Sequence, residues 1–242
     1  MSTTVVYASG ESGRIRLEGG PTYLDAARNN GSITTSATVT TSYPGQNFAA
    51  GDYYCYQSFL LWDTSAVGTD SVSNVDFDVD GETDASDVDY VVEGYAFTWS
   101  GGGLTDADAR DSDAGIPALG SIISSYDTTG GWTTTAGYNQ TMGALSGFNA
   151  AINGSGNTEV VLISSHHRTE TAPTGSEYVI FQCTGNTNDA RLTITHAASV
   201  TLTYAKPDSD ISASGWATAP LWSKVDDPPD TPDATVVTGT AS

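Results

Sequence analysis

Closely spaced aspartates are the residues whose types and spacing come nearest to a chemical site. Three of them alternate with apolar residues over 76–80 and precede Gly81, which matches the first half of a calcium loop. The twelfth position of that loop is Asp87 and not the usual glutamate. The alternation predicts a strand with a wet aspartate face, and carboxylates spaced along a strand do not wrap one ion. Ca²⁺ or another cation is better expected at the turn between residues 80 and 89, or in the loop 106–113. The candidate ligands at that turn are Asp80, Asp84, Asp87 and Asp89.

The histidines are the other candidates for metal binding. His166 and His167 stand near Glu170, but zinc needs three or four convergent ligands and the remaining histidine is His196. We therefore interpret residues 166–176 as a solvent-exposed loop. The sequence contains no nucleophile elbow, phosphate-binding loop or HExxH motif. No acidic pair stands out among 29 carboxylates for glycoside hydrolysis, so we expect no enzyme activity.

Aromatic residues offer a second kind of site, because their rings can stack on a ligand. The aromatic residues between Tyr53 and Trp62 are interpreted as core and not as a sugar platform. The candidates for ligand stacking lie near predicted loops, where rim packing is the alternative interpretation: Trp99, Tyr126, Trp132 and Tyr138.

The charge restricts the environment and the partners. Eight basic residues face 29 acidic ones, which gives a net charge of −21. Such a chain repels itself at low salt and is screened at molar salt, which favours a halophilic environment. No basic patch is available for nucleic acid. No apolar run approaches the ~20 residues of a membrane helix, so no membrane insertion is expected. Residues 1–10 do not look like a signal peptide.

Short alternating segments separated by Gly, Asn, Asp and Ser predict an all-β fold, an antiparallel β-sandwich or jelly roll. Residues 52–63 (DYYCYQSFLLWD) are apolar on both faces, which indicates a central, buried strand. Residues 144–153 are the one convincing helix, and residues 81–87 form a polar turn. Cys55 and Cys183 lie in strand-like runs. We interpret them as separate buried thiols, and a disulfide between them stays open.

The composition changes after residue 205, so we expect a sandwich over 1–205 and an extended arm over 206–242. The arm holds five of nine prolines and both lysines. Its Pro/Asp-rich stretch 226–233 is incompatible with a central strand or a helix interior. Apolar residues are expected to anchor the arm on this domain or on a neighbouring subunit: Trp216, Leu221, Trp222, Val236 and Val237.

Four stretches resemble one known module. They are residues 12–28, 54–65 with the phrase FLLWDTS, 148–153 and 177–181. Together they are similar to the jelly-roll module of the DNRLRE type, which occurs in secreted prokaryotic proteins and in structural proteins of tailed viruses. Gln57 and Ser58 stand where that family usually has a basic residue. The resemblance implies a sandwich like a carbohydrate-binding module and no enzyme activity.

These observations together favour a non-enzymatic structural protein of a haloarchaeal tailed virus. It would be a head decoration, turret or tail-fibre subunit at the virion surface, in high salt. The expected partners are other virion proteins, further copies of the chain, and a host cell-surface glycan or glycoprotein. The alternative is a carbohydrate-binding or adhesion module of a halophile cell-surface protein. A soluble inhibitor that mimics DNA and binds a basic enzyme is a third hypothesis.

The acidic surface predicts a fold that depends on salt. Because the Debye length grows from ~3 Å at molar salt to ~30 Å at 0.01 M, repulsion between carboxylates should weaken the fold as salt is removed. Far-UV circular dichroism across a KCl series tests this. A spectrum and melting profile that do not change with salt would contradict the halophilic interpretation.

Overall fold

Strands dominate the structure, as the alternating pattern predicted. A computed structural model describes residues 1–99, 103–134, 137–138, 140–185, 188–198, 201–206 and 233–238, the last two segments by their backbone alone. The strands are β1 (Ser2–Tyr7), β2 (Gly13–Gly20), β3 (Ser32–Ser36), β4 (Thr41–Ser42), β5 (Gly45–Ala49), β6 (Asp52–Asp63), β7 (Ser71–Val79), β8 (Gly81–Ser86), β9 (Val91–Ala96), β10 (Ile122–Asp127), β11 (Gln140–Thr141), β12 (Asn157–Ser164), β13 (Ser176–Gln182), β14 (Arg191–Ala197), β15 (Thr201–Lys206) and β16 (Asp233–Thr238). The α-helices are α1 (Tyr23–Ala27), α2 (Ser146–Ala151) and α3 (Ser165–Arg168), and single 3₁₀ turns are η1 (Ser65–Val67), η2 (Asp106–Asp108), η3 (Pro117–Leu119) and η4 (Thr128–Gly130).

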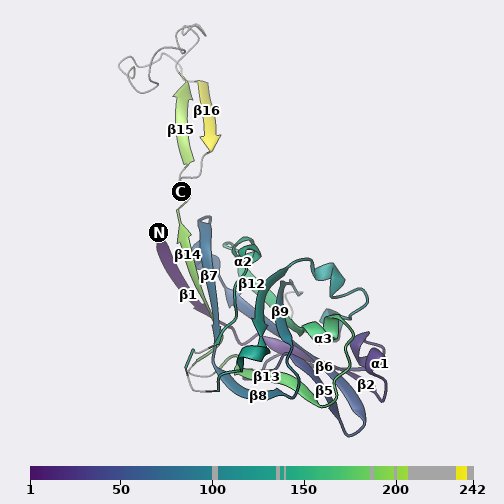
Figure 1. The fold of residues 1–242 in the computed structure, drawn as a ribbon. Coiled ribbons are helices and arrows are strands. Elements are labelled where there is room, and N and C mark those ends of the chain that lie inside the picture. The colour runs from purple at the N-terminus through teal and green to yellow at the C-terminus, as the bar shows by residue number, and fades with distance from the viewer. Residues whose placement is uncertain are drawn as a thin grey trace. The chain divides into compact units, whose positions relative to one another are not determined.

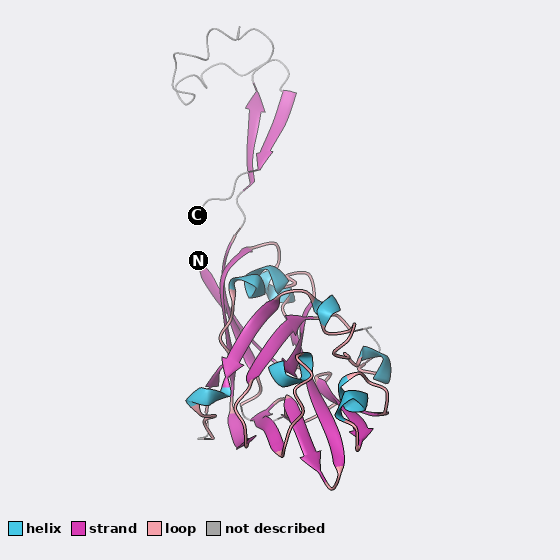
Figure 2. Ribbon diagram, turned by 45° about the vertical axis from the view of Figure 1, so that its right-hand side comes forward, coloured by secondary structure: helices cyan, strands magenta, loops and turns pink. Residues whose placement is uncertain are grey.

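The first unit, Met1–Ala197, contains two antiparallel sheets. The smaller one has the order β1-β14-β7-β11. The larger one follows the path β10-β9-β12-β6-β5-β13-β4, with β2 and β3 added beside β6 and β8 added beside β13. Figures 1 and 2 show these strands with short helices at their ends. The predicted all-β class is confirmed.

The main core lies between the two sheets. Phe77 of β7 and Leu192 of β14 come from the smaller sheet, while Leu60 and Trp62 of β6 come from the larger one. The rings of Trp62 and Phe77 meet edge to face, with centroids 5.3 Å apart. Side chains from both inner faces therefore interdigitate, which is the packing of a β-sandwich.

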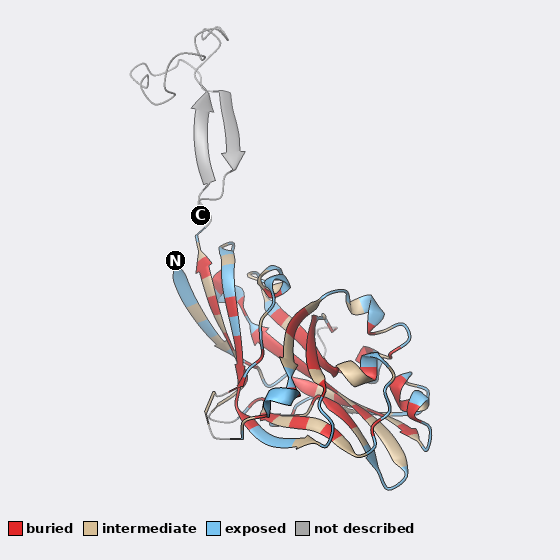
Figure 3. Ribbon diagram, viewed as in Figure 1, coloured by how far each residue is buried: buried red, intermediate tan, exposed pale blue. Residues whose placement is uncertain are grey.

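A second core covers the other face of the larger sheet. Residues of opposite parity along β6, including Cys55 and Phe59, pack there with Ile15 of β2. Helix α1 and the segment 97–119 close this core from outside. Strand β6 is therefore buried on both faces, as its continuous apolar run predicted. Figure 3 shows the buried residues concentrated along the central strands.

The cysteines lie in different cores, Cys55 in the second and Cys183 in the first, and both are free and buried. The interpretation as two separate thiols is confirmed. Burial raises the pKa of the Cys183 thiol to about 12, so it stays protonated and unreactive at neutral pH.

Helices α1 and α3 were not predicted, whereas α2 lies within the expected segment 144–153. Both missed helices have five or fewer residues, too short for a periodic sequence signal. They are held by burial of Tyr23 and Ala26 in α1 and of His167 in α3. The prediction of a polar turn at 81–87 was also wrong. Residues 81–86 form β8, an edge strand that pairs with β13. In the described part of the chain no helix has the length and apolarity to cross a membrane.

The second unit, Ala198–Ser242, contains β15 paired antiparallel with β16. The sequence analysis placed residues up to 205 in the sandwich, whereas β15 pairs with β16 inside a unit that begins at Ala198. Val236 and Val237 belong to β16. Trp216, Leu221 and Trp222 lie outside the described residues, and docking of this unit stays a prediction.

Helix α2 provides a test of the main core. Phe148 is fully buried and its ring centroid lies 6.1 Å from that of Phe77. We predict that Phe148→Ala lowers the free energy of unfolding by about 3–5 kcal/mol, because it removes a large buried ring and leaves a cavity. Leu145→Ala, at a neighbouring residue that is 43% exposed, is the matched control and should cost about 0.5 kcal/mol or less. Equal losses in chemical denaturation would contradict the packing.

Candidate functional site

The aspartates predicted to hold a cation are instead acceptors for the protein's own donors. Asp80 is buried and accepts a hydrogen bond from the side-chain amide of Asn188 at 2.8 Å. Asp84 and Asp87 accept from backbone N–H groups of other loops, and Asp89 is exposed. Within the described residues, no three Asp, Glu, His or Cys side chains converge as metal ligands. The structure therefore does not bring these four carboxylates together.

The wet aspartate face predicted along residues 76–80 is wrong at two of its three positions. Asp76 is exposed, but Asp78 and Asp80 are buried. Strand β11 pairs with the end of β7, where Thr141 donates to Asp78 at 2.9 Å. The Arg191 guanidinium lies 3.1 Å from the Asp78 carboxylate and neutralises it. Strand β11, which is distant in the sequence, covers this part of β7. The local alternation of apolar and polar residues cannot indicate such a cover.

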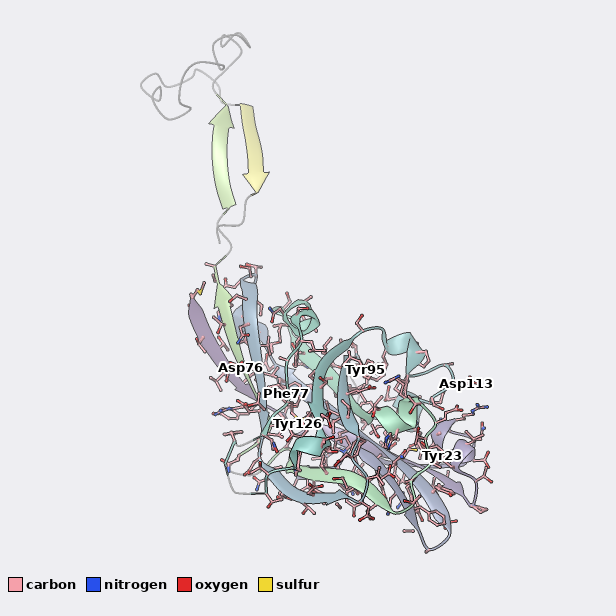
Figure 4. All side chains as sticks on the ribbon, in the orientation of Figure 1. Tyr23, Asp76, Phe77, Tyr95, Asp113 and Tyr126 are labelled. Carbon is pink, nitrogen blue, oxygen red and sulfur yellow. The ribbon has the colours of Figure 1, made fainter. Side chains whose placement is uncertain are left out.

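The four aromatic residues proposed for ligand stacking do not form one platform. Trp99 and Trp132 are buried, and the Trp132 indole N–H donates to the carbonyl of Ile180 at 3.0 Å. Tyr126, labelled in Figure 4, is half-buried with its ring 5.2 Å from that of Trp132. Tyr138 lies under the Arg191 guanidinium, 3.8 Å from its ring centroid. These residues pack against the protein, the alternative weighed at the outset.

Half-buried tyrosines and two arginines instead meet on one face of the larger sheet. Arg16 of β2 lies opposite Tyr56 of β6, Tyr56 opposite Gly45 of β5, and Gly45 opposite Tyr178 of β13. Directly opposed residues of antiparallel strands share a face, so one row of residues crosses four strands. Residues two positions along each strand join the same face. We call this surface the tyrosine patch and define it as Arg14, Arg16, Tyr43, Tyr54, Tyr56, Tyr178 and Ile180.

The patch contains a small pocket. Tyr43, Tyr56, Tyr178 and Ile180 line a volume of about 280 Å³. The Tyr43 ring centroid lies 4.9 Å from that of Tyr56 and 6.0 Å from that of Tyr178. Gly45 lies between the two strand tyrosines, and a Cβ there would come within 2.5 Å of the Tyr178 backbone. The glycine therefore lets β5 approach β13 closely at this position.

The Tyr43 and Tyr56 hydroxyls of the patch stay protonated. Burial is the largest influence on both Tyr43 and Tyr56 and raises the pKa of each phenol, although nearby arginines act in the opposite direction. Neutral phenols at working pH can both donate and accept hydrogen bonds. The patch therefore offers flat apolar rings and amphoteric hydroxyls side by side.

Arg14 is unlike the other arginines of the chain. Its guanidinium lies 4.1 Å above the Tyr43 ring and makes no hydrogen bond or ion pair with any described residue. The other five arginines each donate hydrogen bonds to protein oxygens; Arg16, for example, donates to Glu18 at 3.3 Å. The patch thus presents a cation whose N–H donors are free for a ligand.

A buried hydrogen-bond network supports the patch from the opposite face of the same strands. Gln46, next to Gly45, donates to Glu177 at 2.7 Å, and Glu177 precedes Tyr178. The Tyr23 hydroxyl donates to the side-chain oxygen Oε1 of Gln46 at 2.8 Å. His166 Nδ1 lies 3.0 Å from the same Glu177 carboxylate. These bonds lock the register of β5 against β13 and thereby the spacing of the rings.

The solvent-exposed loop predicted at 166–176 was wrong at its start. Residues 165–168 form α3, which begins after Ser164, whose hydroxyl caps the N–H of His166 at 3.1 Å. His167 is fully buried, with Nε2 3.0 Å from the carbonyl of Ala27. The two histidines bond to different partners and do not converge.

The patch was missed because its members come from distant segments and because Tyr54 and Tyr56 were assigned to the core. That assignment is correct for Phe59 and Trp62, which are fully buried, but both tyrosines are half-buried. The available signal was the residue type. Tyrosine carries a polar tip that prefers water or a partner, whereas residues 59–62 of the same strand are Phe, Leu, Leu and Trp.

The buried imidazole of His167 makes stability depend on pH. Burial lowers its pKa from 6.5 to about 4, so the unfolded chain binds more protons between these values. The stabilisation present above pH 6.5 is lost as the pH falls towards 4, by about 3 kcal/mol. We predict that His167→Gln, which keeps a donor, flattens urea-unfolding free energies across this window. His166→Gln is the control, and an unchanged pH slope in His167→Gln would contradict the assignment.

Comparison with known proteins does not assign the chain to a family. No protein-family model matches the chain, and no curated protein is significantly similar to it. The resemblance to the DNRLRE-type module stays a prediction.

Proposed function

We propose that this chain is a non-enzymatic attachment protein on the surface of a halophilic virus particle, where the tyrosine patch binds an acid-bearing saccharide of the host surface. The observation that carries the proposal is the pocket between Tyr43, Tyr56 and Tyr178, together with Arg14 beside it, which is unpaired among the described residues. Rings and a free guanidinium on a rigid sheet face serve binding and supply no nucleophile or general base.

The rings favour a saccharide. Half-buried tyrosines give large contact area at small conformational cost, because few torsions must be fixed. Their hydroxyls add hydrogen bonds that suit the alternating apolar and hydroxyl surface of a sugar. The pocket volume of about 280 Å³ lies just below the usual range for ligand sites, which suits one ring of a longer saccharide chain. The open sheet face leaves room for the neighbouring units.

The free guanidinium favours an acid group on that saccharide. Arginine binds carboxylate or sulfate through two parallel N–H···O bonds, which gives direction as well as charge. Arg14 stacks on the Tyr43 ring, and its N–H groups bond to no residue in the described part of the chain. The net charge of −21 repels anions at long range, but at molar salt the Debye length is ~3 Å and the local contact decides.

Two observations favour a location on the surface of a virus particle: the acidic composition of the chain and its resemblance to a module of virion proteins. An acidic surface with two lysines in 242 residues suits a protein that stays soluble in brine. The similarity to a module of tailed-virus structural proteins supports a virion rather than a cellular location. A second unit after Ala198 gives the chain a part, distinct from the patch, through which it can join the particle.

The patch by itself also supports an adhesion module of a halophile cell-surface protein. Both functions need saccharide binding, so location separates them. Mass spectrometry of purified virions that finds the chain supports attachment. Its absence from virions and presence in the host envelope would support adhesion instead.

Calorimetric titration in molar KCl tests the patch, with oligosaccharides of glucuronic acid, their sulfated glucose counterparts and neutral glucose oligomers as probes. We predict that Arg14→Gln weakens binding of the acidic probes about 10- to 100-fold, the value of a charge-assisted hydrogen bond. Tyr56→Ala should weaken all probes that bind.

Arg28→Gln is the matched control, because it removes the same charge from a half-exposed arginine that bonds to Glu170 outside the patch. Equal loss in the Arg14 and Arg28 variants would remove the patch from binding. Binding of neutral probes alone would overturn the role of Arg14, and failure of every probe would overturn the function.

A further inference from the structure

Strand β1 is an open edge of the smaller sheet. It pairs with β14 on one side, and no described residue pairs with its other side. Figure 1 shows it at the margin of its sheet. An open edge presents a row of unpaired backbone N–H and C=O groups and is a template for another strand.

This edge lacks the features that usually protect the edge of a sheet. Its sequence, STTVVY, has no charged residue, proline or glycine, and its register with β14 contains no bulge. The edge strand β8, in contrast, carries Glu82 and Asp84. Strand β3 (SITTS) is an uncharged edge as well, but β1 is longer and carries two valines and a tyrosine.

The alternation of hydrogen-bonded pairs along β1 and β14 shows which residues of β1 have backbone N–H and C=O groups that point away from β14. Residues of β1 and β14 pair from Ser2 with His196 to Tyr7 with Arg191, and the next pair is bonded from the Ala8 N–H to the Ala190 carbonyl at 2.7 Å. In an antiparallel ladder, bonded and non-bonded pairs alternate. The even-numbered residues therefore bond to β14, while the backbone groups of Thr3, Val5 and Tyr7 point outward.

The same three residues carry the exposed side chains. Val5 is 45% and Tyr7 53% exposed, whereas Val6 packs against the main core. Free backbone groups and uncovered apolar surface thus coincide at alternate positions. Both requirements for adding a strand are met by one set of residues.

The edge is also held rigid. His196, which is buried, lies with Nε2 2.9 Å from the Thr4 hydroxyl and with Nδ1 2.6 Å from the Asp70 carboxylate. This chain of bonds ties β1 through β14 to the residue before β7. A strand held in one register loses less entropy when it pairs.

We propose that two copies of this chain associate through β1, with the two strands antiparallel about a two-fold axis at Val5. This register places Val5 opposite Val5 of the second copy and Thr3 opposite Tyr7. Every outward N–H and C=O of these residues then finds a partner, and the side chains pair on one face. The two smaller sheets become one continuous sheet.

The distribution of charge favours a second copy of the chain as the partner of β1. Two chains of net charge −21 repel over most of their surfaces. Strand β1 has no acidic or basic side chain, and the residues of β14 include no acid. This strip is where two acidic molecules can meet without opposing carboxylates. The inference does not depend on the tyrosine patch or on its ligand.

Sedimentation velocity in molar KCl over a concentration series tests the dimer. Val5→Asp places two carboxylates directly opposite each other across the axis and should raise the dimer dissociation constant at least ~10-fold. Val88→Asp is the matched control, because Val88 is also 45% exposed and lies outside β1. A wild-type chain that stays monomeric, or a dimer that survives Val5→Asp, would overturn the proposal.

Cysteine cross-linking tests the register without adding charge. Val5→Cys brings two thiols onto Cα atoms about 5.5 Å apart, within disulfide range, so mild oxidation should link the dimer. Thr3→Cys places its two thiols far apart in the same register and should not link. The native cysteines are fully buried and free, so they do not compete. Linking by Thr3→Cys and not by Val5→Cys would overturn the register.

Discussion

Strand β6 is hydrogen-bonded along both edges and covered by apolar side chains on both faces, and this double constraint organises the first unit. Strand β2 occupies one edge, while β5 and β12 share the other. Leu60 and Trp62 face the core between the sheets, and Phe59 faces the second core. On the face of Leu60 and Trp62, the strand continues to Tyr56 and Tyr54, which are partly open to water. The strand that holds the cores together therefore also positions the rings of the patch.

The few arginines explain how so acidic a chain keeps carboxylates inside. Glu93 is buried and receives two hydrogen bonds of 2.7 Å from Arg168, and Asp78 is paired with Arg191. Removing either arginine would leave a buried carboxylate without a compensating charge, which is destabilising. Arg168 and Arg191 thus neutralise two buried carboxylates, and the surface acids depend on salt for screening. Arg14, which makes no hydrogen bond or ion pair with any described residue, is the arginine that singles out the patch.

The fold was more predictable than the candidate site. Residues 52–63 predicted a central strand because they are apolar on both faces, whereas a half-buried strand alternates between apolar and polar residues. Helix α2 was expected within 144–153. Helices α1 and α3 gave no signal, since one turn is too short for a periodic pattern and depends on docking. The patch was not predicted at all. Tyr43, Tyr56 and Tyr178 are separated by up to 135 positions in the sequence, and only strand register places them in one row.

The sequence by itself determined the strand-rich class, the buried central strand and the acidic surface, because residue composition and the period of two are local properties. The tertiary structure alone decided which carboxylates are buried, that 81–86 pairs as a strand, and that Tyr54 and Tyr56 are half-buried while Phe59 is not. It also decided that Thr3, Val5 and Tyr7 have outward backbone groups. These outcomes depend on which distant segment covers or pairs with a strand, and a strand's own residues do not encode its neighbour's register.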